Sequence, residues 1–187
     1  MRLIANETLN ALLISNICFI AGSLVTTDQG IIAIEKINPK IHTINGKKIV
    51  EITQSISSYD FLICFEKNAL GNNIPSQKTC MTHVHKVFYK GKLRKAIDFV
   101  NLSDNVYKTK YKGHVLYNVL MDKHEIIKVN NLNCESLNPT NPILQLYKVF
   151  KNCSFEQRQK LAREYNECTI ANNKFNKKQL KYFKQCL

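Results

Sequence analysis

The sequence predicts a mostly β domain followed by a C-terminal α-helical appendage. Between Cys18 and about Asn133, short apolar runs alternate with turn residues, a spacing typical of all-β domains. After the segment 138–142, in which two prolines lie among asparagines, the apolar residues recur at the period of a helix. With 187 residues, the chain is long enough for one domain with a real core and an appendage.

The elements follow in chain order from these patterns. Residues 3–16 are expected to form a short helix, because their leucines fall on one side. Asn45-Gly46 and Lys90-Gly91 have the composition of hairpin turns. Strands are expected over 23–27, 31–34, 48–57, 61–65, 85–89, 92–94, 106–111, 113–120 and 126–129.

The C-terminal appendage is expected to contain three helices. The first follows Pro142, and the second begins with a capping box from Ser154 to Gln157 and continues to about Cys168. A third, basic helix is expected from Lys174 to Cys186. Residues 141–187 hold ten Lys and Arg against three Asp and Glu, and so contribute +7 of the net charge of +13. We expect this tail to pack against the β core with a basic outer face, and weak contact of 174–187 with nucleic acid or an acidic surface is the alternative.

The seven cysteines favour buried, mostly reduced thiols in a reducing compartment. Their number is odd, their spacings are long and no C-x-x-C occurs, which argues against a zinc site and against a disulfide framework. No metal and no cofactor is expected. The cysteines are Cys18, Cys64, Cys80, Cys134, Cys153, Cys168 and Cys186.

The uncharged stretch from Thr8 to Thr27 raises the question of a signal peptide or anchor over residues 3–27. Asn10, Ser15 and Asn16 interrupt its apolar run, which is too polar for a membrane span. A cytoplasmic protein is therefore expected, and the signal or anchor is the alternative.

Cys18, Thr82 and the nearby histidines supply the parts of an acyl-transfer site. The sulfur of Cys18 is suited to attack the carbonyl carbon of Ile17, directly upstream of its own amide. The amide nitrogen is a poor leaving group and must be protonated as it departs, which a histidine does well near neutral pH. Each residue alone has an ordinary structural explanation, since a single buried cysteine usually acts as a small hydrophobe.

Three blocks of sequence, in order, resemble the hedgehog/intein (Hint) autoprocessing family. The first is CFIAGSLVTTDQGIIAIEKI from Cys18, and the second, TCMTHVHKVFYKGKLRKAIDFV, contains Thr-x-x-His as Thr82 to His85. The third is VLYNVLMDKHEIIKVNNL. The resemblance covers residues 18 to about 139, and the versions most similar to it are those of large eukaryotic DNA viruses.

The resemblance implies a Hint-type horseshoe of short twisted antiparallel strands and a role for each matched residue. Cys18 is the nucleophile of an N-to-S acyl shift that makes a thioester at Ile17, and Thr82 and His85 bind and protonate the scissile amide. His124 and Asp122, in the third block, assist. The substrate is the chain's own N-terminal flank, and water, a thiol or another small nucleophile is the acceptor.

The departures from the family pattern favour cleavage of the hedgehog type over splicing. Asn133-Cys134 mimics a splice junction, but Leu132 stands where a splicing intein has histidine. Cys134 is then either a second acyl acceptor or a buried structural thiol. The expected division is 1–17 as flank, 18–138 as the Hint-like β domain and 139–187 as the basic helical tail. An inactive Hint-fold binding module that uses the tail is the competing interpretation, and host cytoplasm is the expected location if the protein is viral.

Overall fold

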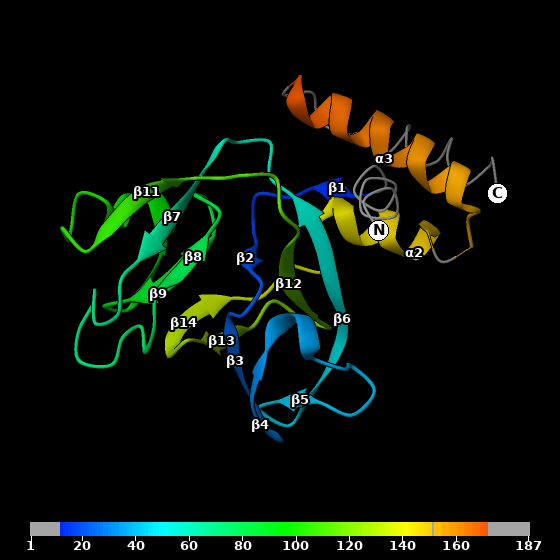
Figure 1. The fold of residues 1–187 in the computed structure, drawn as a ribbon. Coiled ribbons are helices and arrows are strands. Elements are labelled where there is room, and N and C mark those ends of the chain that lie inside the picture. The colour runs from blue at the N-terminus through cyan, green and yellow to red at the C-terminus, as the bar shows by residue number, and fades with distance from the viewer. Residues whose placement is uncertain (1–11, 151, 172–187) are drawn as a thin grey trace, which may run out of the picture. The chain divides into compact units, whose positions relative to one another are not determined.

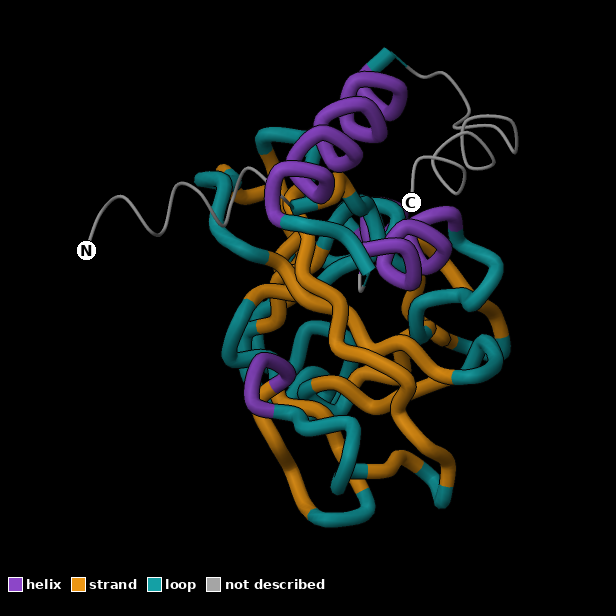
Figure 2. The backbone as a smooth tube through the Cα atoms, turned by 90° about the vertical axis from the view of Figure 1, so that its right-hand side faces the viewer, coloured by secondary structure: helices purple, strands orange, loops and turns teal. Residues whose placement is uncertain are grey.

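The computed structural model describes residues 12–150 and 152–171 of the chain (Figure 1). The chain divides into two compact units, of which residues 16–139 form one, and residues up to 15 together with those from 140 onward form the other. The first unit consists of strands, turns and two short 3-10 helices, so the prediction of a mostly β fold is confirmed. Figure 2 shows its strands joined by turns and loops.

Two antiparallel sheets make up the β unit. The first sheet runs in the order β6 (Lys47–Ile56), β12 (Leu116–Met121), β2 (Phe19–Ile20), β8 (Thr79–Met81), β7 (Phe61–Phe65) and β11 (Val106–Lys110), and β5 (Thr43–Ile44) pairs with β6. The second runs in the order β10 (Lys92–Lys95), β9 (Lys86–Tyr89), β14 (Leu132–Glu135), β13 (Ile126–Val129), β3 (Leu24–Thr27) and β4 (Gly30–Ala33). The 3-10 helices are η1 (Ile34–Lys36) and η2 (Ala96–Phe99).

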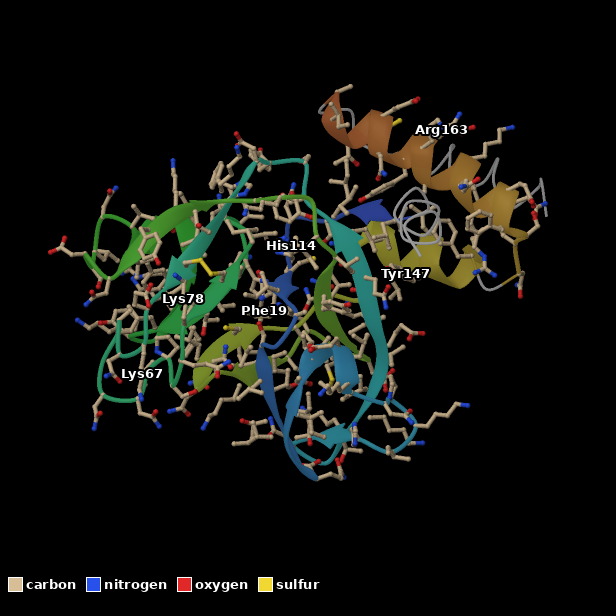
Figure 3. All side chains as sticks on the ribbon, viewed as in Figure 1. Phe19, Lys67, Lys78, His114, Tyr147 and Arg163 are labelled. Carbon is tan, nitrogen blue, oxygen red and sulfur yellow. A yellow bond between two sulfur atoms is a disulfide. The ribbon has the colours of Figure 1, made fainter. Side chains whose placement is uncertain are left out.

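The main core of this unit takes side chains from both sheets. Phe19 of β2 is fully buried there, and Figure 3 shows it in the middle of the unit. Large buried side chains in the same core include Phe65, Met81, Phe99, Met121 and Ile127. Because β2 contributes to this core and has a strand on each side, the chain just before Phe19 lies at the centre of the first sheet.

Both predicted hairpin turns are present. Asn45 and Gly46 join β5 to β6 with φ of 52° and 70°, and Lys90 and Gly91 join β9 to β10 with φ of 48° and 80°. Two successive positive φ angles give the turn a twist that matches that of the paired strands.

Each of the nine predicted strands corresponds to a strand of the β unit, but four further strands of this unit were not predicted: β2, β5, β8 and β14. Three of them have two or three residues, too few for an alternating pattern to be read. His85, predicted to begin a strand, lies instead in the turn that precedes β9.

The second unit contains helices α2 (Pro142–Phe150) and α3 (Phe155–Ile170) and the short strand β1 (Leu13–Ile14). The predicted capping box is confirmed, since Ser154 Oγ accepts from the Gln157 N–H and Gln157 Oε1 accepts from the Ser154 N–H. The short helix predicted over 3–16 is wrong at residues 13–14, which are extended, and residues 3–11 lie outside the described part of the chain. The predicted helix from 174 to 186 lies outside it too.

Cys64 and Cys80 form one disulfide that the sequence did not predict (Figure 3), while the other four cysteines of the described residues are free, in agreement with the expectation of mostly reduced thiols. The two residues are directly opposite each other in the antiparallel pair of β7 and β8, with their Cα atoms 4.1 Å apart. Opposite residues of such a pair project to the same face, within disulfide reach. Chain length disfavours a framework of several disulfides but carries no information about a single cross-strand pair.

Among the described residues, Cys18, Cys134 and Cys153 are buried thiols, as predicted. None of the helices in the described part of the chain is both long enough and apolar enough to cross a membrane.

Candidate active site

The peptide bond between Ile17 and Cys18 lies directly before β2, and its N–H is hydrogen-bonded to Thr82. The Cys18 N–H donates to Thr82 Oγ1 at 2.8 Å, and Thr82 Oγ1 donates to the carbonyl oxygen of Asn16 at 2.7 Å. The Thr82 N–H also donates to the Cys18 carbonyl oxygen at 2.9 Å. These contacts arise because β2 pairs with β8 at Phe19 and Met81, which sets Cys18 opposite Thr82.

The carbonyl side of the same peptide bond is bound by Asn118, from the strand on the other side of β2. Asn118 Nδ2 donates to the Ile17 carbonyl oxygen at 2.5 Å. Asn118 Oδ1 accepts from the Val119 N–H at 2.8 Å, which fixes the orientation of the amide. The Asn118 side chain is completely buried, so no water competes for this donor at the carbonyl.

The sequence prediction missed Asn118. The available signal was one asparagine in the otherwise apolar run from Leu116 to Met121. A buried amide in such a strand needs polar partners, and here one of them is the Ile17 carbonyl group.

His85 is fully buried behind the tight turn that begins at Thr82. Its N–H donates to the Thr82 carbonyl oxygen at 3.1 Å, and its ring packs on Phe19 with centroids 4.2 Å apart. Nε2 lies 3.1 Å from the carbonyl oxygen of Glu135. Because a carbonyl oxygen only accepts, Nε2 carries the proton, and Nδ1 keeps a lone pair that makes no hydrogen bond.

Burial lowers the pKa of His85 to about 3, and the hydrogen bond to the Glu135 carbonyl opposes this only in part. The imidazole is therefore neutral near pH 7. The unused nitrogen of the neutral ring can accept a proton and return it, but a pKa this far below 7 makes His85 a weak base in its buried position.

The thiol of Cys18 lies in an apolar cluster, the Cys18 cluster, whose other members are Leu62, Cys64, Cys80, Tyr111 and Leu116. The Tyr111 hydroxyl donates to the His114 carbonyl oxygen at 2.6 Å. Burial raises the pKa of Tyr111, and the charge that Cys18 can carry raises it further. The nucleophile candidate thus lies among apolar groups, beside a neutral phenol and a disulfide.

Glu135 connects two of the predicted histidines. Its backbone carbonyl contacts His85, and its carboxylate lies 3.1 Å from His124 Nε2. The same buried carboxylate accepts from the Lys86 N–H at 3.0 Å and lies 3.8 Å from Lys86 Nζ. His124 is therefore linked to His85 through one residue that the sequence prediction did not single out.

Asp122 and Cys134 lie in quite different surroundings. Asp122 is exposed and lines a surface hollow of about 320 Å³, together with Lys47, Lys48, Met121, Lys123 and Glu125. Cys134 is fully buried in the main core, opposite Ile127 in β13 and Val87 in β9. Burial raises the pKa of its thiol, and the charge of Glu135 raises it further, which keeps the sulfur protonated near pH 7.

No arrangement of three or more His, Cys, Asp or Glu side chains in the described part of the chain is suited to hold a metal ion. The residues that meet at the peptide bond between Ile17 and Cys18 are Cys18, Thr82 and Asn118, with His85 against the neighbouring turn. They are the groups that an acyl transfer needs, namely a thiol, a hydroxyl, an oxyanion donor and a proton carrier.

The comparison with protein families matches residues 17–141 to a model described as Hint domain. No curated protein matches the chain. Among solved structures, the solution structure of a bacterial intein-like domain from Clostridium thermocellum is similar, with 17% sequence identity and a TM-score of 0.47. The match covers 66% of this chain and 100% of that one.

Proposed function

Because the chain belongs to the Hint domain family, whose members process their own backbone by splicing or cleavage, we propose that it cleaves itself between Ile17 and Cys18. The reaction is an N-to-S acyl shift followed by release of the upstream flank, as in hedgehog-type processing. We further propose that it belongs with the Hint versions of large eukaryotic DNA viruses, on the three sequence blocks described above.

One observation carries the proposal: the peptide bond before Cys18 is bound at both ends by buried side chains. Thr82 accepts from its N–H, and Asn118 donates to its C=O. A buried peptide bond in a strand is ordinarily satisfied by backbone groups of its neighbours. The arrangement here supports chemistry at this bond, because it leaves a donor aimed at the oxygen where negative charge develops.

In the first step the Cys18 sulfur bonds to the carbonyl carbon of Ile17. The thiol loses its proton as this bond forms, and the resulting oxyanion is held by the Nδ2–H of Asn118. The carbon–nitrogen bond then breaks, and the proton lost by the thiol ends on the departing Cys18 nitrogen, with His85 as the proposed donor to that nitrogen. The products are a thioester at Ile17 and a new amine at Cys18, with no net gain or loss of protons.

In the second step a nucleophile, either water or a small thiol, attacks the thioester and releases residues 1–17. The Cys18 sulfur leaves as a thiolate and regains a proton. Thr82 keeps the Cys18 nitrogen in position for the reaction, because the Thr82 hydroxyl is itself oriented by its hydrogen bond to the Asn16 carbonyl oxygen. His124 assists indirectly, through the Glu135 carboxylate, and we assign Asp122 no step.

Splicing at Asn133 and Cys134 is the second candidate and has less support. The Cys134 thiol is buried in the core with a raised pKa, which disfavours it as an acceptor. An inactive binding module, using the basic tail on nucleic acid or a partner, is the third. Its residues 174–187 lie outside the described part of the chain.

Intact mass of the full chain decides among these functions. We expect dithiothreitol and hydroxylamine each to convert the wild type to a fragment beginning at Cys18, and Cys18→Ala to stay whole. Hydroxylamine is the informative nucleophile, because dithiothreitol also reduces the Cys64–Cys80 disulfide within the Cys18 cluster. A wild-type chain that stays whole with both reagents would refute self-cleavage and leave the binding module.

A further inference from the structure

Cys18 is completely buried, so its thiol is closed off from solvent. After the first step of the proposed reaction the thioester lies at this sulfur, and the acceptor nucleophile has to reach it there. One of the groups around the sulfur must therefore move aside before the second step. The Cys18 cluster defines which groups these are.

Tyr111 is the member of this cluster whose movement disturbs the fold least. The other members that surround Cys18 lie in strands β7, β8 and β12, and displacing one of them breaks the pairing of that strand with its neighbours. Tyr111 lies just beyond the end of β11, and at 8% exposure it is the most exposed member of the cluster. The cluster therefore opens most readily at Tyr111.

The Tyr111 side chain joins the loop between β6 and β7 to the loop between β11 and β12, which run side by side (Figure 1). Its hydroxyl donates to the His114 carbonyl oxygen at 2.6 Å and accepts from the Ser57 N–H at 3.4 Å. The Tyr111 N–H donates to the Asp60 carbonyl oxygen at 2.7 Å. One hydroxyl group thus holds both loops closed beside the Cys18 cluster.

The loop that follows Tyr111 turns back over it. Residues 112–114 are exposed, and Gly113 has a φ of 77°, which a side chain would oppose. This turn brings the His114 carbonyl oxygen to the Tyr111 hydroxyl. Breaking that hydrogen bond lets the exposed loop move away without separating any pair of strands.

We propose that Tyr111 is the gate through which the acceptor nucleophile reaches the Cys18 sulfur. The hydroxyl sets how often the two loops open, and the ring sets how large a nucleophile can pass. The nucleophile is small and uncharged, because it has to enter an apolar cluster. The closure stands on the contacts of Tyr111, and its effect on cleavage rests on the proposed function.

The closure is tested by the rate at which iodoacetamide alkylates Cys18, without a reductant, so that the disulfide of the cluster stays intact. Peptides that span the Ile17–Cys18 bond report on uncleaved chains alone. Tyr111→Phe keeps the ring but loses both hydrogen bonds of the hydroxyl, and it should speed this alkylation about tenfold. Cys134, buried in the main core of the same unit, is the internal reference, and its alkylation should not change.

Tyr107→Phe is the matched control. Tyr107 also packs against the Cys18 cluster, but from within β11, and its hydroxyl bonds to Glu66 and Lys78. The control should leave the alkylation of Cys18 at the wild-type rate. Equal alkylation of Cys18 in Tyr111→Phe and the wild type would overturn the gate. A parallel rise at the reference thiol would overturn it as well, because it marks a generally loosened fold.

The effect on cleavage is measured with hydroxylamine and with the larger O-benzylhydroxylamine, at concentrations where the rate is proportional to the nucleophile. Tyr111→Phe should speed cleavage by both reagents about tenfold, the same factor as for alkylation, because one opening limits all three reactions. Tyr111→Leu removes the ring and should favour the larger reagent further, by about threefold or more. Wild-type rates for both variants would overturn the gate's role in the reaction. A wild type that stays whole refutes the proposed function, and the alkylation rates then still decide the closure.

Discussion

Replacing Asn118 with alanine tests the centre of the proposed chemistry. The substitution removes the side-chain donor to the Ile17 carbonyl oxygen. The lost group is neutral, fully buried and fixed by Val119, so it resembles a single preorganised oxyanion donor. Loss of one such donor slows acyl transfer by about 100- to 1,000-fold, or about 3–4 kcal/mol in the barrier.

The same substitution also weakens the fold, and the two effects must be measured separately. It leaves the Val119 N–H without its side-chain acceptor, at a cost of about 1–3 kcal/mol in unfolding free energy. The assay is therefore single-turnover cleavage by hydroxylamine, followed by intact mass, under conditions where circular dichroism shows the variant to be folded. Asn118→Asp should be slower still near pH 7, because an ionised carboxylate repels the developing oxyanion.

Thr53→Val is the matched control for Asn118→Ala. Thr53 lies opposite Asn118 in the pairing of β6 with β12 and is equally buried, but its hydroxyl contacts the Asn118 carbonyl oxygen, not Ile17. The control should cleave at nearly the wild-type rate. If Asn118→Ala is folded and its rate lies within about threefold of the wild type, the assignment of Asn118 as oxyanion donor is wrong.

Four further predictions concern the surrounding groups. Thr82→Val should slow cleavage by about tenfold or more, and Thr82→Ser should restore it, since the serine hydroxyl can make both hydrogen bonds of Thr82; cleavage rates check both. The pKa of His85 falls on folding from 6.5 to about 3. Between these two values the unfolded chain binds more protons than the folded chain, so folding stability is lost as the pH falls from 6.5 toward 3. The full loss is about 5 kcal/mol in unfolding free energy. Urea unfolding at pH 7.5 and 4.5 should show this loss, and His85→Asn should lack it; an equal loss in both proteins contradicts the cause. Replacing Cys64 and Cys80 together with alanine should lower the unfolding free energy by about 3 kcal/mol, as expected for a loop of this size, and unchanged urea midpoints count against it. Cys134→Ala should lower stability by about 1–2 kcal/mol and leave the cleavage rate unaltered; a chain that no longer cleaves would return this thiol to the mechanism.

The sequence predicted the longer strands well, because their patterns are local. The run from 61 to 65 and the alternation in 48–57 each indicate a strand without reference to any partner. Strand β2 is different, since its two residues are extended only because β12 and β8 lie on either side. The sequence contains no local signal for such a strand.

The same distinction holds for the candidate site. Cys18, Thr82 and His85 could be selected because their spacing resembles a family motif. Asn118 offered only the weak signal of one amide in an apolar strand, and Glu135 offered none, because the site partners of both lie far away in sequence. The Asn118 donor meets Ile17 only after β12 pairs with β2, and Glu135 meets His85 only after β14 pairs with β9.

The positive charge on the edge strand β10 has a role that requires no ligand. Strand β10 ends the second sheet, and its four residues are all exposed. Three of them, Lys92, Arg94 and Lys95, are cations. An exposed strand edge invites pairing with the same edge of another molecule, and like charges on both edges oppose it. Part of the net charge of +13 thus acts between copies of the protein and protects the chain against aggregation through its open sheet.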